Sequence, residues 1–110
     1  MQIGKILLIL SLFLASFNAF AAGDYEAGKI KAYTCSGCHG IVEYKNTYPT
    51  YNVPRIGGQN KEYLVIALQG FKSGERKHKT MNLQAEALSE QDIEDIAVYL
   101  AGQTNNPEAE

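Results

Sequence analysis

Cys35-Ser36-Gly37-Cys38-His39 is the stretch of this 110-residue sequence that decides its fold. Two thiols three positions apart, followed at once by an imidazole, form the spacing at which c-type haem is attached covalently. On one helical turn the two thiols face the same side, and the histidine after them is placed to bind the haem iron. The motif therefore predicts one haem c, attached through Cys35 and Cys38, with His39 as an axial iron ligand.

Three other interpretations of the cysteine pair fit the sequence less well. A thioredoxin-like dithiol belongs in a βαβ setting and does not need the histidine, and no strand pattern flanks the motif. A structural zinc site needs four ligands, and His78, the other histidine of the chain, lies too far away for a zinc finger. A disulfide between cysteines at this separation is sterically poor.

Residues 1–21 are typical of a secretory signal peptide. Lys5 supplies the positive start, residues 6–14 are almost entirely apolar, and Ala19-Phe20-Ala21 is a small-x-small cleavage site. The apolar run is shorter than the ~20 residues that span a bilayer, so a permanent membrane anchor is the weaker alternative. We expect cleavage after Ala21, a periplasmic location and no permanent membrane span.

The remaining residues, 22–110, are expected to form one small domain. Loss of Lys5 leaves nine basic residues against twelve acidic ones, a formal charge of -3, which argues against a nucleic-acid partner. A domain of this size buries only a modest core as a bare chain. A large apolar cofactor at its centre would supply much of the missing interior.

Apolar residues at helical spacing predict three clear helices. The first covers 24–34 with Asp24 as its N-cap, the second begins after Asn60, and the third begins after Ser89 with Asp92 completing a capping box.

The segments between these helices have weaker patterns. Residues 41–53 are predicted to be loop with at most one helical turn, and 72–88 a long polar loop or weak helix, with no strand anywhere in the chain. Residues 103–110 are polar and acidic, and we expect a flexible tail there.

Taken together, these patterns resemble the small class I cytochromes c of bacteria, the soluble group that includes cytochromes c4, c5 and c553. The resemblance covers nearly all of the predicted mature domain. It implies an all-α cytochrome c fold, with about four helices around one covalently attached haem, in which Gly28 meets Tyr99 where the first and last helices cross. The residues that carry it are Gly28, Cys35-Ser36-Gly37-Cys38-His39-Gly40, Pro54-Arg55-Ile56-Gly57-Gly58-Gln59, Tyr63-Leu64, Phe71, Gly74-Glu75-Arg76, Met81, Leu88-Ser89 and Ala97-Val98-Tyr99-Leu100.

Met81 is the candidate for the second axial ligand. It is the only methionine left once the signal peptide is removed, and it lies in the segment that must return over the other haem face. Its alternative role is that of a gap-filling core residue, but the polar residues around it do not resemble a core segment. His78 is the competing ligand, and its simpler interpretation is a solvent-exposed histidine.

The resemblance also suggests residues beyond the iron ligands. The family places a proline carbonyl where it accepts the N–H of the proximal imidazole, and Pro54 is the matching position. Such a carbonyl would fix the histidine tautomer. Arg55 is a candidate to face a haem propionate, with an exposed loop arginine as the alternative. The tyrosine-rich insert Tyr44–Tyr51 departs from the shortest family members, and its role is left open.

These residues imply one-electron transfer rather than an enzyme, because both axial positions of the iron would be filled. A peroxidase-like enzyme would need an open position with acid-base groups above it, and none is evident near Met81. A cytochrome subunit bound permanently in a larger dehydrogenase or reductase is the alternative. Redox proteins are the expected partners, and a cluster of basic residues suggests a positive docking rim: Lys72, Arg76, Lys77 and Lys79.

Overall fold

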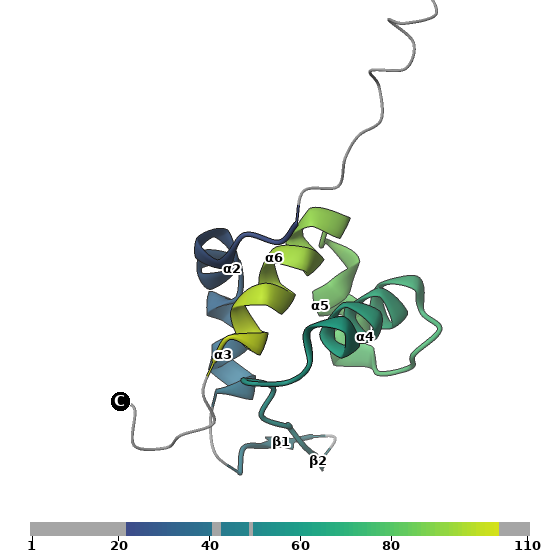
Figure 1. Ribbon diagram of the computed structural model, residues 1–110. Helices are drawn as coiled ribbons and strands as arrows, with labels where there is room; N and C mark the ends of the chain where they lie inside the picture. Colours follow the sequence, from purple (N-terminus) through teal and green to yellow (C-terminus); the bar gives the residue numbers. More distant parts are fainter. Residues whose placement is uncertain (1–21, 41–42, 49, 104–110) are drawn as a thin grey trace, which may run out of the picture.

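The computed structural model describes residues 22–40, 43–48 and 50–103 (Figure 1). The predicted signal peptide and residues 104–110 of the predicted tail lie outside the described residues. The elements in chain order are α2 (Tyr25–Lys31), α3 (Tyr33–His39), β1 (Lys45–Thr47), β2 (Thr50–Asn52), α4 (Lys61–Ser73), α5 (Lys79–Glu86) and α6 (Glu90–Ala101). Among the described residues none of the helices is long and apolar enough to cross a membrane.

The first predicted helix is divided in two. The side chain of Asp24 caps α2 by accepting a hydrogen bond from the Ala27 N–H, as expected from its N-cap character. A turn at Ala32 separates α2 from α3, which then continues through the haem motif to His39. The prediction of one helix ending at residue 34 was therefore wrong at its C-terminal end, because the small and polar residues of the motif have no apolar periodicity that would indicate a helix.

Helix α6 packs against α2 on one side and α4 on the other, and α5 packs against α4 (Figure 1). At the crossing with α2, Gly28 is buried, and a Cβ atom there would lie 2.0 Å from the carbonyl oxygen of Asp95 and 2.8 Å from the Cβ of Tyr99. Only a residue without a side chain permits this approach. The predicted meeting of Gly28 and Tyr99 is confirmed.

The two other predicted helices begin where the sequence indicates. Asn60 caps α4 by accepting from the Tyr63 N–H, and Ser89 and Asp92 form the reciprocal capping box of α6. Gly74 ends α4 in the left-handed conformation, with φ of 82°.

A short antiparallel hairpin replaces the loop predicted for residues 41–53. Strands β1 and β2 pair Lys45 with Asn52, Asn46 with Tyr51 and Thr47 with Thr50. Each strand has only three residues and so cannot show the alternation by which strands are recognised. The expectation that the chain has no strand was wrong for this reason.

The segment around Met81 is helical, so of the two alternatives predicted for residues 72–88 the weak helix holds there and the loop does not. Helix α5 begins at Lys79, and its N-cap is His78, whose side chain accepts a hydrogen bond from the Met81 N–H. His78 is half-buried, so its interpretation as a solvent-exposed histidine was wrong. Helix α5 was hard to predict because its eight residues show no clear apolar stripe and histidine is not a preferred cap residue.

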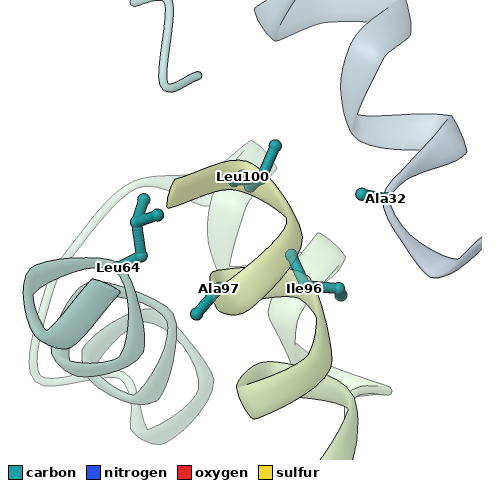
Figure 2. Packing of buried hydrophobic residues seen from close by; sticks show 5 residues of the cluster. All are labelled: Ala32, Leu64, Ile96, Ala97 and Leu100. Carbon is teal, nitrogen blue, oxygen red and sulfur yellow. The ribbon is translucent and has the colours of Figure 1, made fainter. Parts of the chain in front are cut away.

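The buried core lies where α4, α6 and the turn between α2 and α3 meet (Figure 2). Leu64 comes from α4, Ala32 from the turn, and the other members from α6: Ile96, Ala97 and Leu100. Few apolar side chains of the described residues are fully buried, and beyond this cluster they are Ala85 and Ile93. A protein with so small a core needs further apolar contacts to be stable.

Candidate functional site

A cavity of about 330 Å³ opens beside this core and is lined by side chains from α2, α3, α4, α5 and α6. Its walls are largely apolar and include Leu64, Leu68, Phe71, Ile96 and Leu100. Cavities of roughly this size with a few polar groups are typical ligand sites. Five of the six residues predicted to hold the haem line it: Cys35, His39, Pro54, Arg55 and Met81.

The two cysteines lie one turn apart on α3. Cys35 is half-buried at the cavity wall, whereas Cys38 is exposed and is not among the lining residues. Both thiols are free, and burial raises the pKa of the Cys35 thiol. Residues at i and i+3 share one helix face, so the pair can serve one ligand from the same side.

His39 is oriented by the backbone of the segment that follows the hairpin. Its Nδ1 atom lies 2.6 Å from the carbonyl oxygen of Pro54. Because a carbonyl oxygen can only accept, Nδ1 carries the proton, and the lone pair of a neutral ring is then on Nε2. A histidine held in this way has its tautomer set for binding a metal through Nε2.

Met81 reaches the same cavity from α5, in the third residue of that helix. The chain before Met81 is held by the side chain of Asn82. Its Nδ2 atom donates to the carbonyls of Phe71 and Arg76, at 2.8 Å from each. Its Oδ1 atom accepts from the His78 N–H. Sequence reasoning missed this role of Asn82, since a polar residue next to a candidate ligand gives no indication of which backbone groups it will meet.

The basic residues near the cavity differ in how they are held. Arg55 is exposed at its edge. Arg76 lies over the Phe71 ring, 4.7 Å from its centroid, and donates to the Tyr63 hydroxyl, and Lys72 donates to the Leu88 carbonyl. All four residues of the predicted docking rim are exposed, but Lys72 and Arg76 are engaged in these contacts within the protein. Lys77 and Lys79 are the other two members of the rim.

An ion-pair cluster joins the C-terminal end of α2 to the N-terminal half of α6. The Lys31 ammonium lies 2.8 Å from the Asp92 carboxylate and 2.6 Å from that of Asp95. Hydrogen bonds from Lys31 and from the Ser89 backbone lower the pKa of Asp92 to about 2. The Asp24 backbone N–H, followed by Lys31, lowers the pKa of Asp95. This cluster braces the two helices around the cavity.

The cavity suits a flat, mostly apolar group that bears a metal. Two free thiols stand on one side of a short helix, an imidazole has its Nε2 lone pair available, and a thioether enters from a second helix. A cysteine pair at this spacing can attach haem covalently, and imidazole and thioether are the groups that bind the iron in such proteins. Fold and site together define a small helical protein built around a covalently attached haem.

Comparison with known proteins agrees with this class. The family model described as cytochrome c matches residues 25–104. Cytochrome c4 of Stutzerimonas stutzeri is 38% identical over 109 residues, covering 90% of this chain and 50% of that protein. Cytochrome c-554(548) of Halomonas halodenitrificans is 38% identical over 85 residues, covering 74% of this chain and 99% of that protein.

A solved structure shows the same fold. The crystal structure of reduced recombinant cytochrome c4 from Pseudomonas stutzeri superposes with a TM-score of 0.62 at 39% identity, covering 76% of this chain and 47% of that one. The chain thus spans about half the length of the cytochromes c4 that it matches.

The chain belongs to the cytochrome c family, and the resemblance inferred from its motifs is confirmed. A cytochrome c domain with this cysteine-histidine motif holds haem c covalently, and members of the family are electron carriers rather than enzymes. The helical fold predicted from the sequence is confirmed as well, with the hairpin as an addition.

Proposed function

We propose that this chain carries single electrons in a periplasmic electron-transfer chain, using His39 and Met81 as the two axial ligands of its haem iron. The observation that carries the proposal is that both side chains line one cavity although they come from different helices, α3 and α5. The Nδ1 bond to Pro54, which leaves Nε2 of His39 free for iron, supports it.

Each residue of the site would have a defined task. Cys35 and Cys38 would fix the porphyrin through thioether bonds, and Arg55 at the cavity edge would face a propionate. Bound haem supplies a one-electron ferric-ferrous couple. Met81 would favour the ferrous state and raise the reduction potential, while the Pro54 carbonyl would strengthen His39 as a donor.

The apolar walls would keep water away from the iron. Leu64, Phe71 and Ile96 are among the apolar side chains of the cavity wall that would exclude it. With both axial positions filled, no coordination site would be left for a substrate. Electron transfer then requires only that a partner approaches the cavity edge.

Replacement of Met81 by Ala tests the ligand assignment. The variant should keep its fold and its attached haem but have a lower potential, bind cyanide and carbon monoxide, and lose the weak sulfur-to-iron absorption band. Leu83→Ala, on an exposed position of the same helix, is the matched control and should behave as the wild type. An unchanged spectrum and potential in the Met81 variant would assign the ligand to His78 or to a lysine.

Intact mass spectrometry of the exported protein tests attachment and processing together. We expect a chain that begins near Ala22 and carries the mass of one haem. Detection of an unmodified chain with free thiols would contradict attachment through Cys35 and Cys38, and a retained segment 1–21 would contradict the signal peptide.

A further inference from the structure

The second strand of the hairpin, together with the residues that follow it, contacts both helices that carry the proposed iron ligands. Tyr51 in β2 places its hydroxyl 2.8 Å from the Thr80 hydroxyl, next to Met81 in α5. Three residues later the Pro54 carbonyl accepts from His39 in α3. One extended stretch, 51–54, thus connects α3 and α5 along the cavity, and we call it the strap.

The strap also packs against the cap of α5. The Tyr51 ring meets the His78 ring edge-on, with centroids 4.7 Å apart and an interplanar angle of 84°. His78 in turn accepts the Met81 N–H through Nδ1 over 3.4 Å, which is a long hydrogen bond. The Phe71 ring also meets His78 edge-on, but more distantly, with centroids 6.5 Å apart. The position of this weak cap, and with it the backbone of Met81, therefore depends on the rings around it, of which Tyr51 is the nearer.

Helix α5 depends on such outside support. It has eight residues, no acidic side chain in its first turn and a histidine in place of the preferred cap residues. Helices this short are marginal by themselves and take their stability from packing. Part of this packing is against α4. Among the described residues outside 71–82, Tyr51 both hydrogen-bonds to Thr80 and meets the ring of the cap residue His78 edge-on.

We propose that Tyr51 is a positioning residue for Met81, and that the strap couples the placement of the two axial ligands. This rests on the proposed His39/Met81 ligation and assigns a function to part of the Tyr44–Tyr51 insert. Tyr51 lines the cavity, whereas Tyr48 at the hairpin turn is 95% exposed and belongs to the surface.

Cyanide binding to the ferric holoprotein measures this positioning, because cyanide competes with Met81 for the iron. Its apparent affinity rises with the fraction of molecules in which Met81 is displaced. Tyr51→Phe, which removes only the hydroxyl, should raise the affinity about fivefold, the equivalent of one net hydrogen bond. Tyr51→Ala should raise it further and weaken the sulfur-to-iron band, because the contact with His78 is lost too.

Two controls separate positioning from general loss of stability. Tyr48→Phe removes a hydroxyl from the same hairpin and should leave cyanide affinity unchanged. Asp24→Ala removes the N-cap of α2 and should lower the unfolding free energy without changing cyanide affinity. Thr80→Val should match Tyr51→Phe, and the double variant should show no further increase, as expected for two partners of one bond.

Failure of the strap proposal is distinguishable from failure of the ligand assignment. If Met81→Ala opens the iron to cyanide but Tyr51→Phe behaves as Tyr48→Phe does, Met81 is a ligand and the positioning role is overturned. The positioning role is overturned as well if Asp24→Ala raises cyanide affinity as much as Tyr51→Phe. If Met81→Ala leaves spectrum and affinity unchanged, the ligand assignment fails, and the positioning role with it.

Discussion

Gly28 of α2 packs directly against the backbone of Asp95 in α6, so closely that a Cβ atom would lie 2.0 Å from the Asp95 carbonyl oxygen. The neighbouring atom is backbone and cannot move aside as a flexible side chain would. The two helices therefore cross at a distance that only glycine allows. The same crossing carries the ion-pair cluster of Lys31, Asp92 and Asp95.

Replacement of Gly28 by Ala should destabilise the protein in spite of alanine's better helix propensity. Overpacking at a rigid contact costs about 1–3 kcal/mol, and we expect at least about 2 kcal/mol in urea unfolding followed by circular dichroism. Lys29→Ala, at the exposed position next to it in α2, should change the unfolding free energy by less than about 0.5 kcal/mol. Equal stability of the two variants would contradict the close crossing.

The Lys31 cluster should make stability depend on acid pH. Because folding lowers the pKa of Asp92 from 3.8 to about 2, its contribution is complete above about pH 4 and is lost as the pH falls toward 2. Asp95 has a lowered pKa too and adds to the loss in the same direction. The pKa of Lys31 is raised above 10.5, so its contribution is lost only at strongly alkaline pH.

Asp92→Asn isolates this effect from the titration of other carboxylates. At pH 7 the variant should be about 1 kcal/mol less stable than the wild type, the value of a partly exposed hydrogen bond to a charged group. The difference should shrink as the pH falls from 4 toward 2. Glu26→Gln, on the exposed side of α2, should show no such convergence. A difference for Asp92→Asn that stays constant with pH would refute the assignment.

Local signals explain which parts of the fold could be predicted. The caps at Asp24, Asn60 and Ser89 are side chains that bond to backbone within three residues, so the sequence alone indicates them. The hairpin and α5 are stabilised by contacts between distant segments. The bond from Tyr51 to Thr80 joins residues 29 positions apart, which no short window of sequence reveals.

The same distinction holds at the site. The cysteine-histidine motif is contiguous, so the sequence alone predicted haem attachment there. The contact between Pro54 and His39 was predicted from the resemblance to the family. The roles of His78, Asn82 and Arg76 depend on how the chain between α4 and α5 turns back on itself. Their residue types predicted polarity at these positions but not the partners they meet.

A protein that cannot attach haem should fail to fold. Few apolar side chains are fully buried among the described residues, and the cavity beside them would be left without contacts. We expect the double variant Cys35→Ser/Cys38→Ser, expressed without attached haem, to show little helical circular dichroism and no cooperative unfolding. Ser36→Ala keeps both cysteines and should retain haem and fold. A cooperative helical double variant would show that the chain is stable alone.

Docking to a redox partner should depend on two exposed lysines. Lys77 and Lys79 are exposed beside the cavity-lining residues His78 and Thr80, whereas Lys72 and Arg76 are engaged within the protein. An acidic protein with this local positive charge should attract an acidic patch on its redox partner. Lys77→Glu and Lys79→Glu should each slow oxidation by the anionic probe hexacyanoferrate(III) about two- to fivefold at low salt, with an unchanged haem spectrum.

The matched control is Lys29→Glu, which makes the same change in net charge on α2, at an exposed residue that does not line the cavity. It should slow the reaction less than either rim variant, because long-range interactions between exposed charges are screened beyond about 10 Å at 0.1 M ionic strength. The differences among all three should disappear near 1 M salt, where the screening length is about 3 Å. A docking rim acts through its local electric field, so it requires rates that depend on salt and on the position of the charge change. If the stopped-flow rates depend on neither, Lys77 and Lys79 are only solvated surface residues.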